Sequence, residues 1–208
     1  MRLRHALNAG VTAIVLASAA CTDAPLAPPQ ASQTPPVAAS AAVVKPRFMG
    51  GDTVVTRFTI HPRVRRTYLL GGGHLVTIPQ GAVCDPALSS YGPGTWDDPC
   101  TAITRPITVT ARTWHDERGH PRVDFTPRLR FAPTDDPVRM TWLLLYDRAA
   151  ASDPSSTILF CENDVDECVD EALSDPSLVT LRDPLSGYVY RRIKHFSGYN
   201  MAARTAAE

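Results

Sequence analysis

The stretch ITVTARTW, which spans Ile107–Trp114, carries apolar side chains at 107, 109 and 111 in alternation with polar side chains at 108, 110 and 112. A period of two residues is the pattern of a β-strand that buries one face. The same period occurs in VVTRFTI, which spans Val54–Ile60. These two stretches predict that the chain folds through β-strands.

Between residues 51 and 204 we expect about nine to eleven short strands. Gly71-Gly72-Gly73 separates two of them and predicts a hairpin, whereas Val138–Tyr146 has apolar side chains on both faces and predicts a central strand. Only residues 165–174 favour a helix. Frequent turn signals between short strands are typical of an antiparallel sandwich, so the expected fold is an all-β antiparallel β-sandwich. The segments with a strand pattern are 54–60, 64–70, 74–78, 107–114, 123–125, 129–131, 138–146, 158–160, 178–181, 188–193 and 196–202.

Composition excludes several classes of protein. The 208 residues carry 21 Lys and Arg against 21 Asp and Glu, so there is no basic excess to bind a nucleic acid backbone. The 19 prolines disfavour a helical bundle, because each proline inside a helix costs about 3 kcal/mol. No pattern of a turnover enzyme is present, and no cofactor is predicted.

The N-terminus has the features of an export signal. Arg2 and Arg4 precede the largely apolar stretch Ala6–Ala20, and small residues end it. This order predicts a secretory signal peptide over residues 1–20. The small residues before Cys21 also resemble the lipobox of bacterial lipoproteins, which implies a lipid on Cys21 and a place on the outer membrane or the periplasmic face of the cell envelope. Signal cleavage without lipidation is the alternative.

Residues 21–50 are rich in Pro, Ala and Ser. Such a composition buries too little apolar surface to offset the entropy of ordering, so we expect a disordered, proline-stiffened tether. The sandwich domain is expected over 51–204, followed by a disordered tail over 205–208.

Four further cysteines remain: Cys84, Cys100, Cys161 and Cys168. An even number in an exported chain predicts two disulfides, which can pair in three ways. We favour the local pairs, Cys84 with Cys100 and Cys161 with Cys168, because each brackets a loop without a strand pattern. A zinc site is disfavoured, since the chain has no Cys-x-x-Cys pair.

The stretch GGHLVTIPQGAV, Gly72–Val83, resembles the start of the ZU-five β-sandwich domain of ankyrins and netrin receptors, which has relatives among bacterial exported proteins. The resemblance covers about residues 65–203 and implies a non-catalytic interaction or scaffold module. The cysteine-bracketed insertions 84–100 and 161–168 depart from the family pattern, so its partner surfaces are not carried over. The other segments in the family's order are Ile107–Thr110, Phe131–Pro133, Pro137–Met140 and His195–Tyr199.

The triplet His195-Phe196-Ser197 carries the sharpest chemical implication of the resemblance. In some relatives the bond between Phe and Ser breaks by itself through an N-to-O acyl shift. Ser197 would be the nucleophile and His195 the general base. The alternative is structural: His195 bonds locally, Phe196 packs in the core and Ser197 lies in a turn.

Two weaker candidates concern binding. Tyr91 and Trp96 lie in the first cysteine loop, where an exposed aromatic side chain could stack on a sugar or anchor a partner; a small local core is the alternative. Asp164 and Asp166 lie in an acidic loop whose oxygen atoms suit calcium, although the spacing is not that of an EF-hand, and a solvated acidic surface is the alternative.

The leading hypothesis is therefore a non-catalytic lipoprotein of the cell envelope, a monomer attached to the membrane through its N-terminal lipid. Its β-sandwich would bind a protein or glycan partner that the sequence does not identify. The rival hypotheses are a domain that cuts itself once at Phe196-Ser197 and a carbohydrate-binding module.

Overall fold

The structure is a computed structural model that describes residues 53–162 and 168–203. The chain divides into two units, Met1–Val43 and Val44–Glu208, and every described residue belongs to the second. The predicted signal peptide, Cys21, the tether, the tail and the acidic positions Asp164 and Asp166 lie outside the described residues. Among the described residues, no helix is both long and apolar enough to span a membrane.

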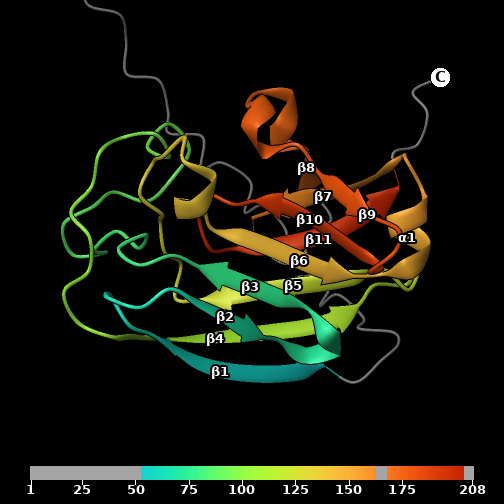
Figure 1. Ribbon diagram of the computed structural model, residues 1–208, viewed down its shortest axis with the longest axis horizontal. Coiled ribbons are helices and arrows are strands. Elements are labelled where there is room, and N and C mark those ends of the chain that lie inside the picture. The colour runs from blue at the N-terminus through green and yellow to red at the C-terminus, as the bar shows by residue number, and fades with distance from the viewer. Residues whose placement is uncertain (1–52, 163–167, 204–208) are drawn as a thin grey trace, which may run out of the picture. The chain divides into compact units, whose positions relative to one another are not determined.

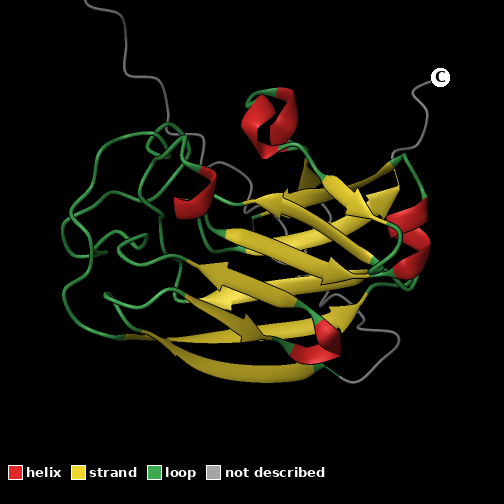
Figure 2. Cartoon of the chain, viewed as in Figure 1, coloured by secondary structure: helices red, strands yellow, loops and turns green. Residues whose placement is uncertain are grey.

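In the described residues, eleven antiparallel strands form two sheets (Figures 1 and 2). The six-stranded sheet has the order β1-β4-β5-β11-β7-β8 and the five-stranded sheet the order β2-β3-β6-β10-β9. The first consists of β1 (Val54–Ile60), β4 (Ile107–His115), β5 (Pro121–Thr126), β7 (Ser156–Cys161), β8 (Cys168–Val169) and β11 (Gly198–Ala203). The second consists of β2 (Arg66–Leu69), β3 (Leu75–Ile78), β6 (Trp142–Tyr146), β9 (Leu181–Asp183) and β10 (Tyr188–Arg192). The predicted all-β sandwich is confirmed.

The core lies between the sheets and follows the alternation in the sequence. Leu143 and Leu145 of β6 are fully buried, as are Val109 and Ala111 of β4 in the other sheet. Phe58 of β1 stacks on Tyr68 of β2 with ring centroids 4.3 Å apart, so aromatic packing joins the two layers. The predicted central strand is confirmed, because β6 is the middle strand of its sheet.

Short helical elements replace some predicted structure. The helix expected over 165–174 is wrong in its described part, which holds β8 and the 3₁₀ turn Glu171–Leu173. Asp170 caps this turn by accepting from the amide of Ala172, and Pro176 follows soon after, so no longer helix forms. Pro176 itself begins a second 3₁₀ turn, Pro176–Leu178.

Other observed elements can be compared with the predicted ones. The strand expected from 138 begins only at Trp142, because the Asp136 side chain caps a 3₁₀ turn over Pro137–Arg139. The short helix α1 (Arg148–Ser152) was not predicted; Asp147 caps it by accepting from the amide of Ala150. The predicted hairpin at Gly71–Gly73 is confirmed, with a 3₁₀ turn between β2 and β3. Residues 129–131 form only isolated bridges.

Both predicted disulfides are present with the local pairing, Cys84–Cys100 and Cys161–Cys168. Stable disulfides occur mainly in proteins of oxidising compartments, so they are compatible with an extracytoplasmic protein.

His74 is a buried histidine that supports the five-stranded sheet. Its Nδ1 accepts a hydrogen bond from the backbone amide of Tyr146 at 2.9 Å. Burial lowers the pKa of His74 from 6.5 to about 4; His115 lowers it further, and Asp147 partly offsets both. The folded protein therefore holds this imidazole neutral, which leaves Nδ1 free to accept.

His74 makes the fold sensitive to acid. The contribution of neutral His74 to the free energy of unfolding is complete above the unfolded-state pKa of 6.5 and is lost as the pH falls through about 4. The loss amounts to roughly 3 kcal/mol. We expect the His74→Asn variant, which keeps an acceptor but cannot titrate, to lose less free energy of unfolding than the wild type between pH 7 and pH 4 in urea titrations. Parallel losses in the two proteins would contradict this role.

Candidate functional site

The peptide bond between Phe196 and Ser197 lies in a buried segment just before β11. Phe196 is fully buried and stacks on Phe125 with ring centroids 4.2 Å apart, while Phe131 packs edge-on at 4.9 Å. The Phe196 amide donates to the carbonyl oxygen of Leu129 at 2.7 Å. Both the side chain and the backbone on the amino side of the bond are thus fixed.

His195 connects Ser197 to a carboxylate. Its Nδ1 lies 3.1 Å from the Ser197 Oγ, and its Nε2 lies 3.0 Å from the Oε1 of Glu171. Because a carboxylate accepts, Nε2 carries the proton, and Nδ1 is left to accept from the Ser197 hydroxyl. The order hydroxyl, imidazole and carboxylate is the arrangement that activates a serine nucleophile.

Glu171 is held from its other side by a buried cation. Its Oε2 lies 2.8 Å from the Nη2 of Arg191. Arg191 has no exposed surface and also donates to the carbonyl oxygen of Ile158 at 2.7 Å and to that of Arg192 at 3.2 Å. Each carboxylate oxygen of Glu171 therefore has a partner, His195 at Oε1 and Arg191 at Oε2. The ion pair with Arg191 holds the carboxylate in position against His195.

Tyr91 approaches the same bond from the first cysteine loop. Its hydroxyl donates to the carbonyl oxygen of Phe196 at 2.7 Å. Burial raises the pKa of Tyr91 to about 12. The hydroxyl consequently keeps its proton at neutral pH and polarises the carbonyl that an adjacent nucleophile would attack.

Trp96 and Tyr199 complete the surroundings of His195. Trp96 stacks on the imidazole with centroids 4.1 Å apart, and its indole also meets the ring of Tyr91 at 4.9 Å. The hydroxyl of Tyr199 donates to the carbonyl oxygen of His195 at 2.7 Å. The ring and the backbone of His195 are therefore both restrained.

The structure brings together part of the predicted candidate set. His195 and Ser197 are in contact. Tyr91 and Trp96, which the sequence suggests as an exposed binding surface, instead pack half-buried around His195. The contact between Glu171 and His195 is not predicted from the sequence. Within the described residues, no group of three His, Cys, Asp or Glu side chains is placed to hold a metal.

A polar cleft of about 560 Å³ opens beside this site. The buried cations Lys194 and Arg192 line it; Lys194 pairs with Asp97 and Asp175, and Arg192 donates to the Thr134 carbonyl oxygen. These contacts tie the first cysteine loop and the 170s segment to the strand that leads into His195.

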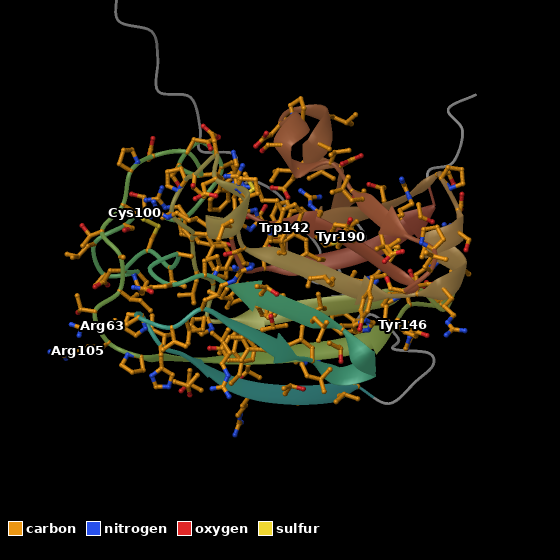
Figure 3. All side chains as sticks on the ribbon, in the orientation of Figure 1. Arg63, Cys100, Arg105, Trp142, Tyr146 and Tyr190 are labelled. Carbon is orange, nitrogen blue, oxygen red and sulfur yellow. A yellow bond between two sulfur atoms is a disulfide. The ribbon has the colours of Figure 1, made fainter. Side chains whose placement is uncertain are left out.

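A separate surface lies on the outer face of the five-stranded sheet, where Trp142, Tyr146 and Tyr190 are labelled in Figure 3. Trp142 packs near Tyr190 at 6.0 Å and Tyr146 near Tyr188 at 5.5 Å. Between these pairs a row of apolar residues crosses all five strands in register. The row consists of Leu69, Leu75, Leu144, Tyr190 and Leu181. Its signal in the sequence is the set of apolar residues on both faces of 138–146, which predicts a central strand but not an exposed apolar row.

The fold and site together define a disulfide-braced β-sandwich with a serine, a histidine and a glutamate assembled beside one of its own peptide bonds. Comparison of the chain with protein-family models, curated proteins and solved structures finds no match.

Proposed function

We propose that this β-sandwich cuts its own chain once, between Phe196 and Ser197. The observation that carries the proposal is the convergence of Ser197, His195, Glu171 and the Tyr91 hydroxyl on one peptide bond. Ser197 is 1% exposed and His195 is 0% exposed, so a separate substrate has no access to the nucleophile. This burial favours a single intramolecular event over turnover.

The reaction follows from the contacts. The Ser197 Oγ attacks the carbonyl carbon of Phe196 while its proton passes to the Nδ1 of His195, and the carbonyl oxygen gains negative charge. The Tyr91 hydroxyl stabilises that oxygen, and Glu171 stabilises the imidazolium. The carbon–nitrogen bond then breaks as the Ser197 nitrogen takes the proton from His195, which leaves an ester.

Water then hydrolyses the ester to the Phe196 carboxylic acid and the free Ser197 hydroxyl, with a free amine at the new N-terminus. A cavity of about 40 Å³, lined in part by Tyr91, Ser89 and Arg130, lies on the loop side of the site, and a cavity of this size has room for a water molecule. The products would stay together, because β11 pairs with β5 on one side and β7 on the other.

Hydroxylamine tests the ester directly, because it cleaves esters under mild conditions that leave peptide bonds intact. We expect hydroxylamine to accelerate fragmentation of the purified, oxidised chain from Thr22 to Glu208 and to leave a hydroxamate on Phe196. A chain that stays whole with and without hydroxylamine would contradict the proposal.

We further propose that the protein is exported and anchored to the cell envelope by a lipid on Cys21. The apolar N-terminal segment, the small residues before Cys21 and the two disulfides support this location. Two or more acyl chains give stable anchoring, since each buried CH₂ contributes about 0.8 kcal/mol. The mass of Cys21 in detergent-extracted protein tests the lipid: an unmodified or absent Cys21 would contradict it.

A second candidate function, the binding module, is favoured by the outer face of the five-stranded sheet. Contiguous exposed apolar surface on a soluble domain usually marks an interaction site. In this row Leu69 and Leu181 at the two ends are 66% and 39% exposed, and Leu75, Leu144 and Tyr190 between them are half-buried. We propose this face, rather than the first cysteine loop, for a protein or glycan partner.

Tryptophan emission tests the glycan form of this idea. We expect titration with neutral polysaccharides to quench the emission of the wild type and to leave that of the Trp142→Ala variant unchanged, because Trp142 is the tryptophan on this face. A flat titration of the wild type would leave only a protein partner for the surface, and equal quenching in the variant would assign glycan binding elsewhere.

A further inference from the structure

The first disulfide closes the loop that reaches the carbonyl of the reactive bond. Cys84 and Cys100 are 16 residues apart in the sequence, and Tyr91 and Trp96 lie between them. The loop forms turns rather than strands, with Gly92 and Gly94 at positive φ. The position of the Tyr91 hydroxyl, 2.7 Å from the Phe196 oxygen, therefore depends on how the loop ends are held.

The second disulfide anchors the segment that supplies the carboxylate. Cys161 ends β7 and pairs in register with Gly198, the residue after Ser197. Its disulfide partner Cys168 begins the two-residue strand β8, and Glu171 follows three residues later. Because so short a strand has few ladder hydrogen bonds, the cross-link adds a covalent tie to the ion pairs that Glu171 forms with Arg191 and Asp175 forms with Lys194.

The following inference about the disulfides rests on the proposed self-cleavage. We infer that both disulfides are positioning elements of the cleavage site, so that the reduced protein keeps the Phe196-Ser197 bond intact and cutting follows disulfide formation. Each disulfide forms when two thiols lose two protons and two electrons to the disulfide of an exchange partner, which becomes two thiols. Cutting would then be confined to a compartment that oxidises the chain.

The test compares cutting before and after oxidation. The chain from Thr22 to Glu208 is purified reduced, refolded with or without oxidised glutathione, and followed by the mass of its fragments. We expect cutting only with the oxidant. In the Cys84→Ser/Cys100→Ser variant we expect slowing of up to about a hundredfold, the lower end of the range for loss of one oxyanion donor.

A double-mutant cycle separates positioning from general stability. Tyr91→Phe in the oxidised chain removes the donor but keeps the disulfide, and should slow cutting by about a hundredfold. Adding Tyr91→Phe to the chain without Cys84–Cys100 should slow cutting little more, because the donor is already displaced. If the disulfide only stabilised the fold, the two changes would act independently and their factors on the cutting rate would multiply. Glu171→Gln in a Cys161→Ser/Cys168→Ser background forms the matching cycle for the second loop.

The outcomes distinguish the two proposals. Wild-type rates in the reduced chain, in both disulfide variants or in Tyr91→Phe would overturn the positioning role while self-cleavage stands. An oxidised wild-type chain that is never cut would overturn self-cleavage, and the inference with it. Circular dichroism of each variant in a Ser197→Ala background checks that the variant folds. If a disulfide variant does not fold, the cutting rate of Tyr91→Phe tests the positioning role instead.

Discussion

The Ser197→Ala variant is expected to stay a single chain under conditions in which the wild type is cut. The substitution removes the only oxygen that the acyl shift can use, and it leaves the small side chain in a site that is already buried. Conversely, Ser197→Cys keeps a nucleophile beside the Nδ1 of His195 and is expected to retain cutting. Gel electrophoresis of the purified proteins over time measures both.

Controls fix the meaning of this result. His195→Ala should slow cutting by about 10² to 10⁴ through loss of the general base. Ser186→Ala, at an exposed position in the turn between β9 and β10, should cut like the wild type. If Ser197→Ala were cut at the same bond, Ser197 would not be the nucleophile, and a contaminating protease would be the explanation to pursue.

The Phe196→Ala substitution is expected to have the largest effect on stability. Phe196 has no exposed surface and packs against Phe125, Phe131 and Phe58. Truncating a phenylalanine in such a core costs about 3–5 kcal/mol, because transfer energy is lost and a cavity remains. Urea titrations in the Ser197→Ala background, where the chain stays whole, measure this free energy of unfolding.

A matched pair of variants supports the comparison. Phe196→Leu keeps most of the apolar volume and should cost less than Phe196→Ala. Leu185→Ala, at a position 98% exposed, should change stability little. A Phe196→Ala variant as stable as Leu185→Ala would contradict the place of Phe196 in the core, and with it the fixed geometry of the reactive bond.

The strands could be predicted where local alternation and burial agree. Ile107–Trp114 forms most of β4 and buries Val109 and Ala111 on the expected face. Val54–Ile60 forms β1 and buries Phe58 and Ile60, although Val54 at its start is exposed. Alternation alone fails at Val138, whose apolar side chain fits a strand but whose backbone follows the Asp136 cap and Pro137 into a 3₁₀ turn. Local hydrogen bonding by a capping side chain outweighs the hydrophobic pattern there.

The site could be predicted only in its contiguous part. His195 and Ser197 are two residues apart, so their contact follows from the triplet itself. Glu171 lies 24 residues before His195 and Tyr91 lies 105 residues before Phe196, and both reach the site through packing and disulfides that span loops. The charge or aromatic character of a loop residue does not specify which distant residue its side chain contacts. Neither the Glu171 contact nor the Tyr91 contact could therefore be predicted from the sequence.

The mass of the intact protein tests the central claim most directly. The chain from Thr22 to Glu208 is measured under non-reducing, denaturing conditions after incubation at neutral pH. Self-cleavage predicts two species, one that ends at Phe196 and carries both disulfides, and one that runs from Ser197 to Glu208. A single species four hydrogens lighter than the reduced chain would contradict self-cleavage and would leave the histidine, serine and glutamate as a structural network in a binding module.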